Sequence, residues 1–186
     1  MRIIAGEWRG RPLAALGKGD AGAHLRPTTD RVRESLFSAL AGGRYGDPLS
    51  GARVLDLFAG TGALGLEALS RGADFVTFVD DGRVATRLIK QNVAALGAAP
   101  RARLMHRDAR RLPENTEPPA TLVFLDPPYG RALGAPVLTA CRSGGWIAPE
   151  ALIVWEENTG QTAPDGFSLI DSRRYGDTHV TFLTAG

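Results

Sequence analysis

The chain has 186 residues, 44% of them hydrophobic, which is enough for one domain with a buried core. Its longest apolar runs, residues 122–125 and 151–155, are far too short to cross a membrane, and residues 1–6 lack the apolar region of a secretory signal. We therefore expect a cytoplasmic protein. Cys141 is the single cysteine, which excludes an internal disulfide, and the three histidines are widely separated, so we expect no metal site.

The net charge is only +2, but it is unevenly distributed. Residues 1–45 hold eight lysines and arginines against four acids, a net charge of +4, whereas the remainder carries −2. Residues 2–5 and 9–13 have the pattern of two short extended runs, which predicts a basic hairpin that carries Arg2, Arg9 and Arg11. Such a segment is suited to contacting phosphates, although charge alone fits an ordinary solvated face equally well.

A helix is predicted next, with its start at Pro27-Thr28-Thr29 and apolar residues at helical spacing over 32–40. We expect Arg31 and Arg33 on its polar face, available to a nucleic acid. We therefore expect residues 1–45 to form an N-terminal hairpin, loop and helix extension to a core of residues 46–186.

From residue 53 onward, short apolar strands alternate with helices, which indicates an α/β fold whose parallel sheet is covered on both faces. The expected strands are residues 54–58, 75–79, 102–106, 121–125 and 152–156, and the expected helices are about 63–71, 83–96 and 133–142. Two further strands, 167–170 and 179–183, have no room for a helix between them and so form an antiparallel pair. The sequence predicts a seven-stranded, mostly parallel sheet that ends in an antiparallel hairpin.

Gly60, Gly62 and Gly65 match the G-x-G-x-x-G pattern of dinucleotide-binding loops, after a strand and before a helix. Asp56, on the strand that enters this loop, would repel a pyrophosphate. The same carboxylate would attract a cofactor with a cationic amino-acid end, such as S-adenosylmethionine, so we expect that cofactor.

Acidic residues recur where successive strands end. Asp80 is placed to accept the ribose hydroxyls of the cofactor, with Asp81 as the alternative, and Asp108 with Ala109 is placed for the adenine. Each of these acids could instead cap a helix. Four of them on successive strands, with Asp56 and Asp126 included, are harder to explain as caps.

Asp126-Pro127-Pro128-Tyr129 follows a buried apolar strand. The prolines fix φ and remove two backbone donors, so the turn is rigid and offers the Asp126 carboxylate and the Pro127 carbonyl as acceptors beside the Tyr129 ring. Two acceptors can draw the lone pair of a nucleobase amine out of the ring plane and make its nitrogen nucleophilic. The alternative is an ordinary proline-rich turn.

Several segments together resemble the RsmD family, class I methyltransferases that modify the N2 amine of a guanine in bacterial small-subunit (16S) rRNA. The resemblance is carried by residues 56–65, residues 126–129, the opening residues 1–6, the Arg26–Glu34 segment and the turn at residues 175–178. It extends over nearly the whole chain and implies a Rossmann-like class I fold and an S-adenosylmethionine-dependent, cytoplasmic, monomeric enzyme acting on 16S rRNA or the assembling small subunit.

The resemblance also implies roles for individual residues. Asp56, Gly60 and Gly62 would hold the methionine end of the cofactor, Asp80 the ribose, and Asp108 and Ala109 the adenine, with Thr28 closing over it. Phe58 would also belong to the cofactor site. Asp126, Pro127 and Tyr129 would orient the guanine, whose base is flipped out of its stack. Asp80 stands where relatives often carry glutamate.

Other functions share parts of this pattern. A DNA adenine-N6 methyltransferase and a protein glutamine methyltransferase use related Pro-Pro-aromatic turns. A nicotinamide-dependent dehydrogenase fits the glycine loop but explains neither Asp56 nor the proline turn. A non-catalytic RNA-binding protein fits the basic N-terminus but has no use for a cofactor pocket.

Overall fold

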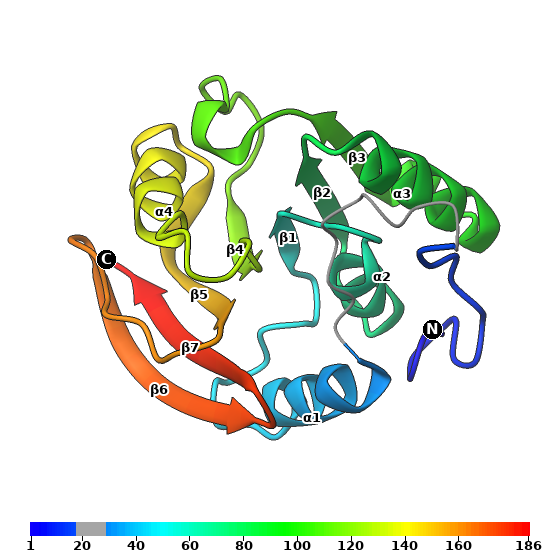
Figure 1. Cartoon of the computed structure of the whole chain (residues 1–186), viewed down its shortest axis with the longest axis horizontal. Helices are drawn as coiled ribbons and strands as arrows, with labels where there is room; N and C mark the ends of the chain where they lie inside the picture. The colour runs from blue at the N-terminus through cyan, green and yellow to red at the C-terminus, as the bar shows by residue number, and fades with distance from the viewer. Residues whose placement is uncertain (18–28) are drawn as a thin grey trace.

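The structure, a computed structural model, describes residues 1–17 and 29–186 and is built on one seven-stranded sheet of order β3-β2-β1-β4-β5-β7-β6 (Figure 1). The strands are β1 (Arg53–Leu57), β2 (Phe75–Asp80), β3 (Ala102–His106), β4 (Ala120–Leu125), β5 (Ile147–Glu157), β6 (Phe167–Tyr175) and β7 (Thr178–Ala185). The first five run parallel, while β7 is antiparallel to both β5 and β6. The α/β fold predicted from the sequence, with its closing antiparallel hairpin, is confirmed.

Helices cover both faces of the sheet. One face packs against α1 (Asp30–Ala41), α2 (Ala63–Ser70) and α3 (Arg83–Leu96), and the other packs against α4 (Gly134–Ser143) and the short 3₁₀ helix η3 (Ala109–Arg111). A second 3₁₀ helix, η2 (Ala99–Arg101), leads into β3. No helix among the residues described is long and apolar enough to cross a membrane.

The order of the strands indicates where in the sheet a ligand binds. From β1 the chain proceeds outward through β2 to β3, and then returns to the other side of β1 with β4. The order therefore reverses between β1 and β4, and in open α/β sheets ligands bind at the carboxyl ends of the strands beside such a point.

The N-terminal residues form the predicted hairpin and are part of the core. The Ile3 amide donates to the Arg11 carbonyl at 2.9 Å and the Leu13 amide to the Met1 carbonyl at 3.0 Å, around one bridge between Arg2 and Pro12. Ile3, Trp8 and Leu13 are buried in the same core cluster as the apolar residues of α1 and α2. The hairpin is therefore fixed in place, with its arginines on a rigid support.

Arg33 corrects the sequence analysis. Its side chain is fully buried rather than on a polar face, because it forms the centre of an ion-pair cluster between α1 and α2. Its guanidinium bonds Asp30 at 2.9 Å and the Arg2 carbonyl, and lies 3.8 Å from the buried Glu67. Arg33 therefore offers no surface to RNA.

Glu67 of α2 is the acceptor around which these groups gather. Its carboxylate accepts the Ile4 amide at 2.8 Å, the Ala5 amide at 3.0 Å and Arg71 Nε at 2.8 Å. One buried carboxylate thus joins the N-terminal hairpin to α2, and through Arg33 it connects to α1.

Glu67→Gln will lower the free energy of unfolding by about 3–5 kcal/mol, because it removes the buried charge that pairs with Arg71 and leaves the buried Arg33 guanidinium with Asp30 as its one acidic partner among the described residues. Urea denaturation followed by circular dichroism measures the change. Glu34→Gln, at an exposed position of α1, is the control and should change stability by less than about 0.5 kcal/mol. Equal effects of the two substitutions would contradict the role given to Glu67.

Candidate active site

A strained residue and two glycines shape the turn between β1 and α2. Phe58 directly follows β1 with φ of 58°, a left-handed conformation that is rare for a bulky side chain and is found most often at functional sites. Gly60 and Gly62 follow with φ of 58° and 77°, and α2 begins one residue later. The chain therefore reverses within a few residues at the carboxyl edge of the sheet.

Two neighbouring elements hold this glycine turn. Asp80, the last residue of β2, accepts the Gly60 amide at 2.9 Å. From α3, the buried Asn92 donates its side-chain amide to the Thr61 carbonyl at 2.9 Å. The turn is thus preformed, which reduces the entropy lost when a ligand binds.

Asp56 lies within β1, one residue before its end, and is 2% exposed. Its Oδ2 accepts the Gly65 amide at 2.9 Å. Burial raises the pKa of Asp56 well above its ordinary value, the Gly65 hydrogen bond opposes this, and the carboxylates of Asp80 and Glu156 raise the pKa further. A buried carboxyl with this pKa gains from a cation placed beside it.

Asp80 is positioned at the second strand end, where the sequence places the ribose acceptor. Its Oδ2 accepts the Gly60 amide and its Oδ1 the Gly82 amide at 2.8 Å, and the residue is 9% exposed. Burial raises the pKa of Asp80, an effect that these two amides oppose. Asp81 is exposed. The ribose role of either residue stays a prediction, but Asp80 also ties the glycine turn to β2.

Asp108 is a helix cap in this structure, the alternative considered for each acid. Its side chain accepts the Arg110 amide at 2.9 Å at the start of η3 and pairs with the Arg110 guanidinium at 2.7 Å. Its hydrogen bond to Arg110 lowers the pKa of Asp108, so the group stays ionised. Ala109 beside it is buried. The adenine role of Asp108 and Ala109 stays a prediction.

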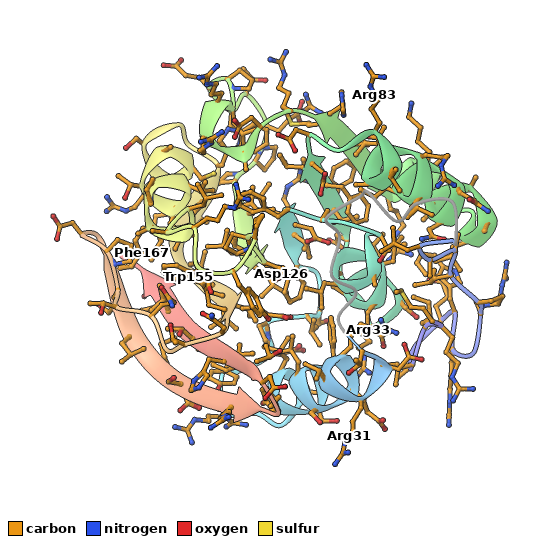
Figure 2. The ribbon with its side chains drawn as sticks, viewed as in Figure 1. Arg31, Arg33, Arg83, Asp126, Trp155 and Phe167 are labelled. Atoms are coloured by element: carbon orange, nitrogen blue, oxygen red, sulfur yellow. The ribbon has the colours of Figure 1, made fainter. Side chains whose placement is uncertain are left out.

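The Asp126-Pro127-Pro128-Tyr129 turn begins where β4 ends, directly beside the glycine turn. The Asp126 amide donates to the Leu57 carbonyl at 3.3 Å, which continues the β1–β4 pairing one residue beyond β4. Asp126 therefore lies beside Phe58, and Figure 2 shows it near the middle of the molecule, between the ends of β1 and β4. Pro127 is buried and Asp126 is partly exposed.

Two other strands hold the far end of the turn. The Tyr129 hydroxyl lies 3.3 Å from Thr178 Oγ1, at the start of β7, and the Gly130 amide donates to the Glu157 carboxylate at 3.3 Å. Both partners are buried, Thr178 at 9% and Glu157 at 4% exposure. The turn is thus fixed by β1, β5 and β7 together.

Sequence reasoning missed the two glutamates that end β5. Glu156, 2% exposed, raises the pKa of Asp56 and is one residue beyond the Leu125–Trp155 pair, level with Asp126. Glu157 holds the turn as described. Two acids that follow the apolar run 151–155 are a signal that could have identified them. Thr178 has no such signal in the sequence.

Four of the five arginines predicted to contact RNA are exposed, and the fifth is buried. Arg2, Arg9 and Arg11 are exposed on the hairpin, and Arg31 is exposed on α1 and points outward in Figure 2. Arg33 is buried, as described above. Thr28, predicted to close over the cofactor, lies outside the described residues.

The site suits a cationic nucleoside cofactor. A Cβ added at Gly65 would lie 2.5 Å from Phe78 Cε1 and 3.0 Å from Asp56 Oδ2, so only glycine lets α2 begin this close to the buried carboxylate. The site thus places a buried acid, which suits an ammonium group, next to a preformed glycine turn. Among the described ranges, no three His, Cys, Asp or Glu side chains gather as a possible metal site.

A doubly wound sheet with a buried acid below a glycine turn and an Asp-Pro-Pro-Tyr turn on the adjacent strand defines a class I methyltransferase. Solved structures agree. The chain superimposes on a methyltransferase of Escherichia coli with a TM-score of 0.81 at 38% identity, covering 100% of this chain and 97% of that one. A methylase of Haemophilus influenzae gives 0.75 at 30% identity, with 99% and 97% covered.

The particular family is equally clear. Residues 1–184 match the family described as "Conserved hypothetical protein 95". Ribosomal RNA small subunit methyltransferase D of Escherichia coli K12 is 41% identical over 172 residues, 91% of this chain and 82% of that protein. The protein of the same name from Haemophilus influenzae is 35% identical, with 95% and 89% covered. The chain belongs to this family, the RsmD methyltransferases.

Asp56→Asn will weaken S-adenosylmethionine binding by roughly tenfold or more, because it removes the charge that pairs with a cationic ligand while keeping an acceptor for Gly65. Burial raises the pKa of Asp56 well above its ordinary value in the free enzyme. A bound cation lowers that pKa, so binding releases a proton and tightens as pH rises through the pKa of the free enzyme.

Calorimetry in buffers of different ionisation enthalpy measures the released protons. The Asn variant should lose the part of the release that belongs to position 56. An undiminished proton release in that variant would show that another group accounts for it.

Proposed function

We propose that this methyltransferase transfers a methyl group from S-adenosylmethionine to the exocyclic N2 amine of a guanine in 16S rRNA. The observation that carries the proposal is the register of β1 and β4, which sets the glycine turn and the Asp126 turn side by side. The relatives named ribosomal RNA small subunit methyltransferase D support the substrate. An rRNA substrate places the reaction in the cytoplasm, and nothing in the proposal requires more than a monomer.

The cofactor site uses the residues at the ends of β1, β2 and β3. Asp56 faces the ammonium end, Gly60 and Gly62 offer the turn around the methionine portion beside Phe58, Asp80 faces the ribose, and Asp108 with Ala109 borders the adenine. Bound there, S-adenosylmethionine supplies a methyl group on a sulfonium that already carries a good leaving group. The protein must then mainly position the acceptor, an effect of proximity and orientation.

The Asp126 turn positions that acceptor. The Asp126 carboxylate and the Pro127 carbonyl accept the two N–H groups of the amine, which turns the nitrogen lone pair out of the base plane and toward the methyl group. The amine nitrogen would take the methyl carbon, the carbon–sulfur bonding pair would leave with the sulfur as S-adenosylhomocysteine, and the alkylated amine, which is acidic, would release its proton to solvent. Tyr129, held by Thr178, stacks on the flipped base.

The alternative functions predicted from the sequence fit the chain less well. A nicotinamide-dependent dehydrogenase and a non-catalytic RNA-binding protein do not fit a chain whose relatives are methyltransferases. DNA adenine and protein glutamine remain testable substrates of the same turn chemistry, so the substrate panel below includes both.

The direct test is transfer of a radiolabelled methyl group to 16S rRNA, free and within the assembled small subunit, followed by nucleoside analysis. We expect N2-methylguanosine and no label in DNA or in a glutamine peptide. Label recovered as N6-methyladenine would overturn the assignment of the base.

Asp126→Ala will reduce turnover by roughly a hundredfold or more while S-adenosylmethionine binding stays near that of the wild type, because Asp126 acts on the acceptor. Single-turnover kinetics and calorimetry measure the two effects. Asp165→Ala removes an exposed acid from a loop and serves as the matched control. Near-normal turnover in the Asp126 variant would exclude the proposed role.

Tyr129→Ala will raise KM for RNA by an amount that corresponds to about 1–3 kcal/mol of lost base stacking. Tyr129→Phe keeps the ring but loses the contact with Thr178, so its KM should stay within a few-fold of the wild type. Steady-state kinetics on both variants separates the ring from the hydroxyl. A Phe variant as impaired as the Ala variant would assign the effect to the hydroxyl instead.

A further inference from the structure

Positive charge is concentrated in a second segment of the chain, residues 83–111, in addition to the N-terminal hairpin. Residues 83–111 contain eight arginines and lysines and one acid, a net charge of +7 in a chain whose total is +2. Seven of the eight basic side chains are exposed. The eighth, Arg101, is half-buried and pairs with Glu7 at 3.0 Å.

Helix α3 arranges three of these cations in a row. Arg83, Arg87 and Lys90 are spaced by four and three residues, so they share one stripe of the helix and are separated by about 6 Å and 4.5 Å along its axis. The opposite face of α3 is buried in the core. Figure 2 shows Arg83 pointing outward from the start of the helix.

The row continues at both ends. Thr86 Oγ1 lies 2.8 Å from His106 Nδ1, which joins the start of α3 to the end of β3, where Arg107 and Arg111 are exposed. At the other end, Arg11 of the hairpin donates to the Ala95 carbonyl of α3 at 2.6 Å.

We name the whole set the basic edge, because β3 is an edge strand of the sheet. It consists of Arg11, Arg83, Arg87, Lys90, Arg107 and Arg111.

Few acids interrupt the basic edge. Asp108 pairs with Arg110, and the exposed Asp81 lies close enough to Arg110 to raise its pKa further. The exposed large apolar residues of the described chain, Leu169 and Ile170, are on β6 at the opposite edge of the sheet. The surface is thus cationic without an apolar centre, unlike a typical protein–protein interface.

We propose that the basic edge binds the phosphate backbone of the RNA substrate beside the target nucleotide, an inference that rests on the proposed function. A row of cations fits a linear polyanion better than a single phosphate, and the end of the row formed by Arg83, Arg107 and Arg111 borders the carboxyl ends of β2 and β3, the edge of the sheet at which the base must enter. The RNA strand then follows α3 from the hairpin to η3, and contacts to the backbone fix its position without reading sequence.

The test compares two triple variants with the same change in net charge. R83Q/R87Q/K90Q removes the row on α3, and R44Q/R142Q/R174Q removes three cations near the opposite edge of the sheet. Fluorescence anisotropy with a guanine-containing RNA hairpin, over a range of salt concentrations, gives Kd and its salt dependence for the wild type and both variants.

We expect the α3 variant to bind the hairpin about tenfold more weakly and to lower the slope of log Kd against log salt by about 2 to 3, since three phosphate contacts are lost. The control variant should stay within about twofold of the wild type. Thermal melts that match the wild type establish that both variants fold. Equal losses in the two variants, or none in the α3 variant, would overturn the proposal.

Methyl transfer distinguishes this proposal from the proposed function. On 16S rRNA the α3 variant should show a raised KM with kcat retained, because no reacting group is changed. If the wild type binds RNA through the basic edge but labels no guanine, the proposed function fails while the surface stands. If guanine is labelled and the α3 variant has an unchanged KM, the surface fails while the function stands.

Discussion

The pairing of β1 with β4 is the constraint on which the rest of the site depends. The ladder aligns Leu57 with Leu125, and one more hydrogen bond, from the Asp126 amide to the Leu57 carbonyl, extends it past the end of β4. Two turns with different tasks therefore start at the same level on neighbouring strands. A slip of this register by one residue would turn Asp126 to the other face of the sheet and separate it from the glycine turn.

Buried carboxylates hold this arrangement together, and each is compensated in a different way. Glu67 is surrounded by backbone amides and two arginines, so it joins the hairpin, α1 and α2. Asp80 fixes the glycine turn and Glu157 fixes the far end of the Asp126 turn, both through backbone amides. Asp56 has the least compensation, which is why burial raises its pKa so strongly and why it suits a cationic ligand.

The sequence predicts the strand and helix order well because apolar periodicity and turn residues determine it locally. Helix α3 begins and ends where its pattern predicts, at Arg83 and Leu96, and Asp56, Asp80 and Asp126 occur at the expected strand ends. Arg33 was misplaced because its burial depends on Glu67, which is 34 residues away and on another helix. Thr178 was not predicted as a site residue for the same reason, because it reaches Tyr129 only through the antiparallel pairing of β7.

The basic edge was not predicted from the sequence, because net charge was counted over long segments of the chain. Residues 46–186 carry a net charge of −2, so the +7 of residues 83–111 is invisible when the chain is divided into an extension and a core. The fold brings this charge together, because α3 aligns three of the cations and the chain that follows β3 adds Arg107 and Arg111 beside them.

The central claim is that the glycine turn and the Asp126 turn together form one site for a cofactor and a guanine amine. A bisubstrate analogue, with the N2 of guanine tethered through a short linker to the sulfur position of adenosylhomocysteine, tests this directly by calorimetry. We expect it to bind more tightly than adenosylhomocysteine, and more tightly than the analogue tethered through the N6 of adenine. Equal affinities for the guanine analogue and adenosylhomocysteine alone would contradict the claim.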